Sequence, residues 1–199
     1  LGKSLVEKLS ALKEKRLKDK DIQTELATYI PVRCGEDFHD DRHDDAEQQI
    51  NGFFKSEKKV LLLLGDSGVG KTMLNLFLER KLLEAYDPTS KESPLPIFIN
   101  LLTIKEPSTQ LLEKHLDKLG FSQSDREELK QRRLIIILDG YDEVHGEGNY
   151  YNSNQLYLWE NLRIRYKSQG KLNDWPCQCQ SLNYFPLNAY KRENNSTCS

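Results

Sequence analysis

A glycine-rich turn that joins an apolar run to a helical pattern constrains the fold of this chain more than any other feature. The turn is Gly65-Asp66-Ser67-Gly68-Val69-Gly70-Lys71-Thr72, which fits G-x-x-x-x-G-K-[ST] at every position. It follows the apolar residues 59–64 and opens residues 72–85, where leucine and phenylalanine recur at helical spacing. Strand, turn and helix in this order are the context in which the motif binds phosphate. We therefore expect an α/β fold with a phosphate-binding loop.

The residue types of this turn suit a nucleotide polyphosphate. Glycines let the backbone wrap closely round phosphate oxygens, and the amides of the loop and the helix N-terminus form a nest for anions. Lys71 is predicted to place its ammonium on the β and γ phosphates, and Thr72 to offer its hydroxyl to Mg²⁺. The predicted nucleotide-binding residues are Gly65, Asp66, Ser67, Gly68, Val69, Gly70, Lys71, Thr72 and Met73.

A second acidic motif follows the apolar run of residues 134–138. Ligands of parallel sheets bind beyond the carboxyl ends of the strands, which is where Asp139 would lie. We expect Asp139 to hold Mg²⁺, partly through water, together with Thr72. Asp142 and Glu143 are candidate catalytic residues beside Lys71, since either could orient or deprotonate the attacking water. The sequence does not rank these two.

The remaining pattern predicts alternating strands and helices. Apolar strands are expected at 59–64, 95–102 and 134–138, and helices at 72–85, 108–119 and 122–132. Ser124 with Glu127 gives a capping-box pattern for the last helix. This order predicts a parallel sheet with helices on both faces. Residues 4–29 carry leucines at roughly helical spacing and predict one amphipathic helix or two short ones.

The two motifs GDSGVGKT and LIIILDGYDE, with the helical segment between them, resemble the NACHT NTPases of the STAND branch of P-loop ATPases. The resemblance implies a three-layer P-loop sandwich with a parallel sheet. It also implies binding of ATP or GTP with Mg²⁺ and a nucleotide-dependent switch in signalling scaffolds that self-associate through other domains. In the family a segment upstream of the loop contributes to the base pocket, and residues 29–33 are the candidate here.

The chain departs from the family after the second motif. The family's sensor arginine ends a strand that lies between the two motif strands, but Arg163 and Arg165 follow no full strand. We therefore expect an incomplete sheet with a gap at its centre and slow hydrolysis. The expected organisation is an N-terminal helical segment or linker at 1–28, a partial NACHT-like core at 29–165 and an atypical, loosely ordered tail at 166–199.

Composition excludes several classes of protein. Lys plus Arg number 29 and Asp plus Glu 31, a formal net charge of -2 that does not indicate a nucleic-acid binder. No apolar run approaches the ~20 residues of a membrane span. With four cysteines and no signal peptide, we expect a reducing, cytoplasmic setting. Because the chain starts at Leu1 and its one methionine is Met73, we expect a piece of a longer protein.

Two other functions remain open on the sequence. A small-molecule or nucleotide kinase shares the phosphate loop but needs an arginine-rich lid, which the sequence does not indicate. A catalytically inactive fragment that serves only as an interaction surface is the other alternative, and the missing sensor strand favours it over strong catalysis.

Overall fold

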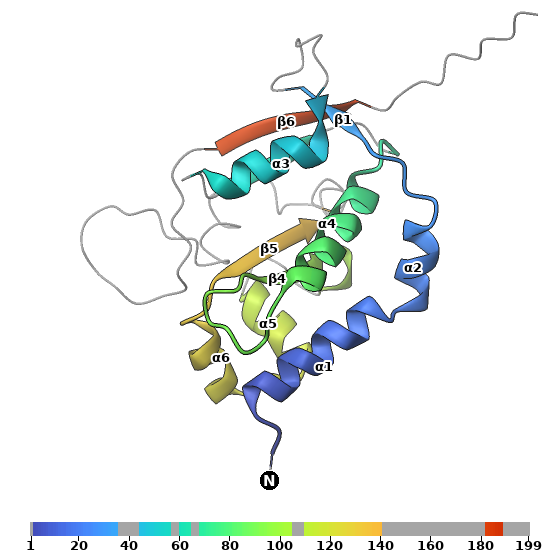
Figure 1. Ribbon diagram of the computed structural model, residues 1–199. Helices are drawn as coiled ribbons and strands as arrows, with labels where there is room; N and C mark the ends of the chain where they lie inside the picture. Colours follow the sequence, from blue (N-terminus) through green and yellow to red (C-terminus); the bar gives the residue numbers. More distant parts are fainter. Residues whose placement is uncertain are drawn as a thin grey trace, which may run out of the picture.

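The computed structural model describes residues 2–35, 44–56, 60–64, 68–104, 110–140 and 182–188. For residues 182–188 the description is limited to the path of the backbone (Figure 1). Several residues singled out in the sequence lie outside the described residues: Gly65, Asp66, Ser67, Asp142, Glu143, Arg163 and Arg165.

Two short helices open the chain, which is the second of the two patterns expected for residues 4–29. Helix α1 spans Leu5–Leu17 and α2 spans Lys20–Leu26. Ser4 and Glu7 form a capping box at the start of α1. Asp19 caps α2 by accepting hydrogen bonds from two backbone amides of its first turn, so the chain bends between the helices.

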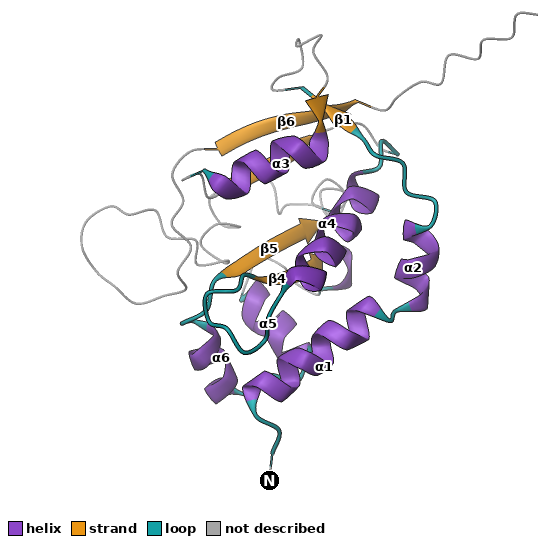
Figure 2. Ribbon diagram, viewed as in Figure 1, coloured by secondary structure: helices purple, strands orange, loops and turns teal. Residues whose placement is uncertain are grey.

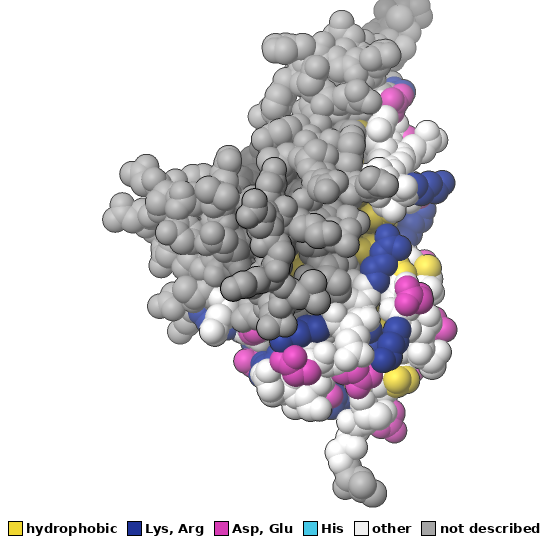
Figure 3. Space-filling model, turned by 90° about the vertical axis from the view of Figure 1, so that its left-hand side faces the viewer, with side chains coloured by type: hydrophobic (Ala, Val, Ile, Leu, Met, Phe, Trp, Pro, Cys, Tyr) yellow, Lys and Arg dark blue, Asp and Glu magenta, His cyan; other side chains and the backbone are white. Residues whose placement is uncertain are grey.

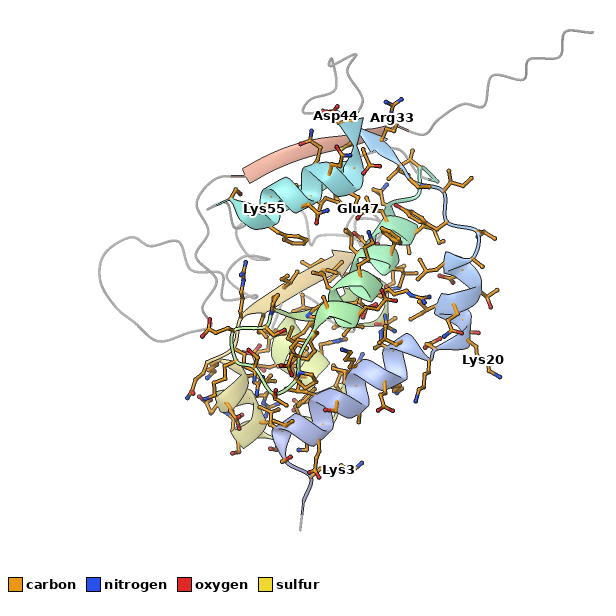
Figure 4. The ribbon with its side chains drawn as sticks, viewed as in Figure 1. Lys3, Lys20, Arg33, Asp44, Glu47 and Lys55 are labelled. Carbon is orange, nitrogen blue, oxygen red and sulfur yellow. The ribbon has the colours of Figure 1, made fainter. Side chains whose placement is uncertain are left out.

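The next described segment forms one layer at the top of the molecule in Figure 1. Strands β1 (Arg33–Cys34) and β2 (Asp44–Asp45) pair antiparallel, and helix α3 (Ala46–Lys55) follows directly. The Asp45 carboxylate caps α3 by accepting from the amide of Gln48 at 3.1 Å. Figure 4 labels Asp44 and Arg33 at the paired strands and Lys55 at the far end of α3.

The central part alternates strands and helices, as the sequence predicts. Strand β3 (Val60–Leu64) leads to helix α4 (Lys71–Ala85), and β4 (Leu95–Asn100) leads through the short 3-10 helix η1 (Leu101–Thr103) to α5 (Leu111–Lys118). Helix α6 (Gln123–Leu129) and strand β5 (Leu134–Asp139) complete it. Strand β4 ends earlier than expected because the Asn100 side chain accepts from the Leu102 amide and starts η1.

The capping box of α6 also differs from the prediction. The sequence pattern suggested Ser124 with Glu127, but the structure pairs Ser122 with Asp125. Ser122 is extended and its hydroxyl accepts from the Asp125 amide, while the Asp125 carboxylate accepts from the Ser122 amide at 2.7 Å. Both serines have an acidic residue three positions on, and the helix begins at the earlier one, so Ser124 falls inside its first turn.

The strands of the described residues form two sheets (Figure 2). One has the order β2-β1-β6-β3 and the other pairs β4 with β5 in parallel. Within the described residues β3 and β5 belong to different sheets, in agreement with the gap expected between the two motif strands. The incomplete α/β architecture is thus the one that the sequence predicts.

Strand β6 (Leu182–Asn188) lies in the tail, in a stretch where the sequence pattern indicated neither a strand nor a helix. It runs parallel to β3, with Leu182 opposite Val60, and antiparallel to β1. Its partners lie more than 100 residues away in the chain, and a pairing of this kind leaves no periodic signature in a seven-residue stretch.

Helices cover both faces of the β4–β5 pair. Alternate residues of both strands, including Ile97, Ile99 and Ile136, pack into a cluster with α5, α6 and the first turns of α1. Ile137, which lies between two of these positions on β5, packs instead against a second cluster with residues of α4, α3 and β3. Because strand side chains alternate between faces, this places β4 and β5 in the middle layer.

The described surface carries charges of both signs. In the view of Figure 3 the lysines and arginines are interspersed with aspartates and glutamates over the lower part of the molecule. Within the described parts of the chain, none of the helices combines the length and the apolar character that crossing a membrane requires.

Candidate functional site

The described end of the phosphate loop adopts a backbone that favours glycine. Gly68 and Gly70 have φ angles of 81° and 96°, in the left-handed region. At Gly70 a Cβ atom would also lie 3.4 Å from Cγ1 of Val32, so the loop and the segment upstream of β1 are in close contact. The positive φ angle and this close contact give the physical reason for glycine at position 70, the second glycine of the motif.

Helix α4 starts with Lys71 directly after that turn. Its N-cap is Gly70, so no side chain caps the first turn, and the first turn holds no acidic residue. The free amides at a helix N-terminus and the positive end of its dipole favour an anion at this point. Lys71 adds a cation at the first position of the helix.

The two motifs meet through Thr72 and Asp139. The Thr72 hydroxyl donates a hydrogen bond of 3.0 Å to Oδ2 of Asp139, although 67 residues separate them. Asp139 is the last residue of β5 and is 5 % exposed. The predicted metal-binding residues are therefore brought together, at the N-terminus of α4 and the C-terminal end of β5.

The alternation of β5 explains why the carboxylate of Asp139 points to α4. Leu134, Ile136 and Leu138 face the cluster around α5, whereas Ile137 faces the cluster that contains α4. Asp139 is two residues after Ile137 and lies on the same face. The chain turns away immediately afterwards at Gly140, whose φ is 78°.

Asn75 is a residue of this site that the sequence reasoning missed. Its amide nitrogen donates a hydrogen bond of 2.8 Å to Oδ1 of Asp139, and it is 7 % exposed. It lies three residues after Thr72, so both side chains project from one face of α4. The signal available in the sequence was a poor helix former inside a leucine-rich helix that follows a phosphate loop.

The segment that precedes β1 packs beside the phosphate loop. Tyr29 stacks on Phe77 of α4, with ring centroids 4.5 Å apart and planes 25° apart. Val32 and Val69 pack against one apolar cluster, while Ile30, two residues before Val32, is 68 % exposed. Burial raises the pKa of the Tyr29 hydroxyl, so this ring stays neutral and serves as packing.

Thr72 and Asp139 carry side-chain oxygens of the kind that bind Mg²⁺. Both side chains present oxygen, the ligand type that this cation prefers, and the two oxygens already approach to 3.0 Å. The residues present therefore fit a magnesium ion that is shared with substrate phosphates.

A strand, a glycine-rich loop ending in Gly-Lys-Thr, a helix and an acidic strand end define the class of P-loop NTPases. The sequence model of the NACHT domain matches residues 59–172, more than half of the chain. This chain belongs to the NACHT family and contains a nucleotide-binding NTPase module. Proteins of this family generally bind nucleotide with Mg²⁺. No curated protein and no solved structure matches the chain.

Proposed function

We propose that this chain is the nucleotide-dependent switch module of a STAND-type signalling or assembly scaffold, and that it binds ATP with Mg²⁺ and hydrolyses it slowly. GTP is the alternative nucleotide. The observation that carries the proposal is the hydrogen bond between Thr72 and Asp139, which joins the two sequence motifs at the C-terminal end of β5.

Each motif residue has a proposed role. The backbone of residues 65–73 cradles the phosphates, and the Lys71 ammonium faces the terminal ones. Thr72 and Asp139 hold Mg²⁺, and Asp142 or Glu143 orients the attacking water. Mg²⁺, when bound there, would neutralise part of the negative charge on the phosphate oxygens.

The base is proposed to lie against residues 29–33. Val32 touches the loop at Gly70, and the exposed side chain of Ile30 offers an apolar surface beside it. Apolar contact with a base edge distinguishes ATP from GTP only weakly, which is why a direct comparison of the two nucleotides belongs in the first experiment.

We expect slow nucleotide hydrolysis because the sequence after the second motif lacks the strand that would end in the family's sensor arginine. An arginine placed on the transferring phosphate is worth roughly 10³–10⁵ in rate. Arg163 and Arg165 follow no full strand in the sequence, so we propose that the chain switches by binding and self-association rather than by rapid turnover.

The test is calorimetric titration of the 199-residue chain with ATP, ADP and GTP in the presence of Mg²⁺, repeated with Lys71→Ala. We expect the variant to lose affinity for the triphosphate more than for the diphosphate, because the lysine faces the terminal phosphates. Hydrolysis by the parent chain should stay well below ~1 s⁻¹, the lower end of the range for efficient phosphoryl-transfer enzymes.

Lys81→Ala is the matched control. Lys81 belongs to the same helix, pairs with Glu47 of α3 and lies 5.0 Å from the Phe77 ring centroid, away from the loop. The Lys81→Ala variant should bind ATP, ADP and GTP with the same affinities as the parent chain. Equal affinity of Lys71→Ala and the parent for ATP would refute the proposed site.

A further inference from the structure

The carboxylate of Asp139 is held from two sides by α4. Thr72 donates to Oδ2 at 3.0 Å and Asn75 donates to Oδ1 at 2.8 Å. Both Asp139 and Asn75 are buried, with exposed fractions of 5 % and 7 %. A buried carboxylate oxygen needs a donor, and Asn75 supplies one to the oxygen that faces away from Thr72.

The chemistry of that donor matters for a metal site. An ionised carboxylate only accepts hydrogen bonds, so the side-chain nitrogen of Asn75 must be the atom that faces it. The amide satisfies Oδ1 without adding a charge, whereas a lysine or arginine at this position would neutralise the carboxylate in place of the cation. Neither of the two hydrogen bonds that Asp139 accepts here therefore comes from a cationic side chain.

The arrangement also fixes the direction of the carboxylate. Thr72 and Asn75 lie three residues apart on one face of α4, so the two hydrogen bonds hold both oxygens of Asp139 along the same helix. Rotation of the carboxylate would break at least one of them. Partners of this kind orient metal-binding carboxylates and often contribute strongly to metal affinity.

We propose that Asn75 is a positioning residue for magnesium: it holds Oδ1 of Asp139 so that Oδ2 is presented, with the Thr72 hydroxyl, to the cation that accompanies the nucleotide. This inference rests on the proposed function. It assigns to Asn75 an effect on the Mg²⁺-dependent part of nucleotide binding and none on the part that the phosphate loop provides alone.

The first experiment measures the fraction of the 199-residue chain that binds ATP, at a constant ATP concentration, as MgCl₂ is raised from zero. The second measures the affinity of the chain for ADP in EDTA. For Asn75→Ala we expect the MgCl₂ concentration at half-effect to rise about 10-fold, the lower end of the loss that such outer partners cause. ADP affinity in EDTA should stay within about 2-fold of the parent, because the loop backbone and Lys71 are unchanged.

Two further variants separate positioning from folding. Asn75→Leu keeps a side chain of similar shape without the donor, and should shift the MgCl₂ midpoint as Asn75→Ala does. Glu79→Gln changes another buried polar residue one turn along the same helix, which pairs with Arg16 and not with Asp139, and should leave the midpoint where the parent has it.

The outcomes are distinct. An unshifted midpoint in both Asn75 variants overturns the inference while the Lys71→Ala result still supports the nucleotide site. A parallel loss of ADP affinity in EDTA assigns Asn75 a purely structural role and also overturns it. If the parent chain binds no nucleotide with or without MgCl₂, the proposed function and this inference both fail.

Discussion

Buried polar side chains are few in the described part of the chain, and each is tied to a specific partner. They are Asn75, Glu79, Arg132 and Asp139. Two of the four meet at the end of β5, where the proposed metal site lies. Arg132 is 2 % exposed and donates 3.0 Å hydrogen bonds to the carbonyl oxygens of Pro88 and Ser90, so it holds the turn that leads into β4.

The protonation of His115 depends on the fold. It lies on α5 at the edge of the larger apolar cluster, half-buried, as the helical pattern suggests. Burial, together with the nearby cations of Lys118 and Arg16, lowers its pKa to about 4 from an ordinary value of 6.5.

We predict a loss of stability on acidification that His115 controls. Between about pH 6.5 and 4 the unfolded chain binds a proton at His115 that the folded chain does not, so the free energy of unfolding falls as the pH falls through this window. Above it this histidine contributes no pH dependence. Urea unfolding at pH 7.5, 6, 5 and 4.5 measures the effect.

His115→Gln provides the comparison, since glutamine stays neutral throughout. The variant should lose less stability than the parent between pH 7 and 4.5. Carboxylates with lowered pKa values, such as Glu7 and Asp87, are present in both proteins and cancel in the difference. Parallel curves for the two proteins would contradict the prediction.

At the scale of the elements, helix α1 contacts helix α4 through an ion pair between Arg16 and the buried Glu79. Nε of Arg16 donates to Oε1 of Glu79 at 2.9 Å, and the Glu79 side chain is 5 % exposed. The Arg16 guanidinium also lies 5.6 Å from the Phe98 ring centroid on β4. With Leu9 fully buried, α1 packs as part of the core rather than beside it.

We predict that Arg16→Ala lowers the free energy of unfolding by about 2 kcal/mol, measured by urea denaturation. The value lies between the ~0–1 kcal/mol of exposed pairs and the ~3–5 kcal/mol for breaking buried ones, because Arg16 is partly exposed. Most of the cost comes from leaving the Glu79 carboxylate buried without its partner.

Arg80→Ala is the control on α4. Arg80 pairs with Glu84 at the surface, where both side chains are exposed, and its loss should cost under ~0.5 kcal/mol. Adding Glu79→Gln to Arg16→Ala should recover part of the lost stability, since the unpaired charge is then removed. Equal losses of unfolding free energy in Arg16→Ala and Arg80→Ala would show that the buried pair stabilises the fold no more than the exposed pair does.

For the molecule as a whole, β6 joins the β1–β2 ribbon to β3. Its register pairs it with β3 from Leu182 opposite Val60 to Pro186 opposite Leu64, and with β1 through Leu187 and Asn188. The order β2-β1-β6-β3 therefore depends on a segment near the C-terminal end of the chain.

We predict that the amides of β6 exchange slowly with solvent, at rates comparable to those of β3. Hydrogen exchange followed by mass spectrometry measures this, with the exposed residues Lys91 and Glu92 as the fast reference. For residues 182–188 this differs from the loosely ordered tail that the sequence predicts for residues 166–199. Exchange of residues 182–188 as fast as the reference would show that the strand is not maintained in solution.

Interactions between residues close in the sequence account for the individual strands and helices around the site. The strand, phosphate loop and helix around residues 60–85 follow from apolar runs, glycine positions and helical spacing, which act between near neighbours. The same holds for Asp139 at the end of an apolar strand, and these features were sufficient to indicate the NACHT family that the family match confirms. The roles assigned to the site residues remain predictions.

The contacts between residues far apart in the chain could not be predicted from the sequence and are seen in the fold alone. Asn75 is a polar residue in a helix until β5 brings the carboxylate of Asp139 within 2.8 Å, and Glu79 has no partner until α1 packs on α4. Residues 182–188 form strand β6 because they pair with β1 and β3, which are far away in the chain. Such contacts depend on packing between distant segments, and local propensity carries no information about them.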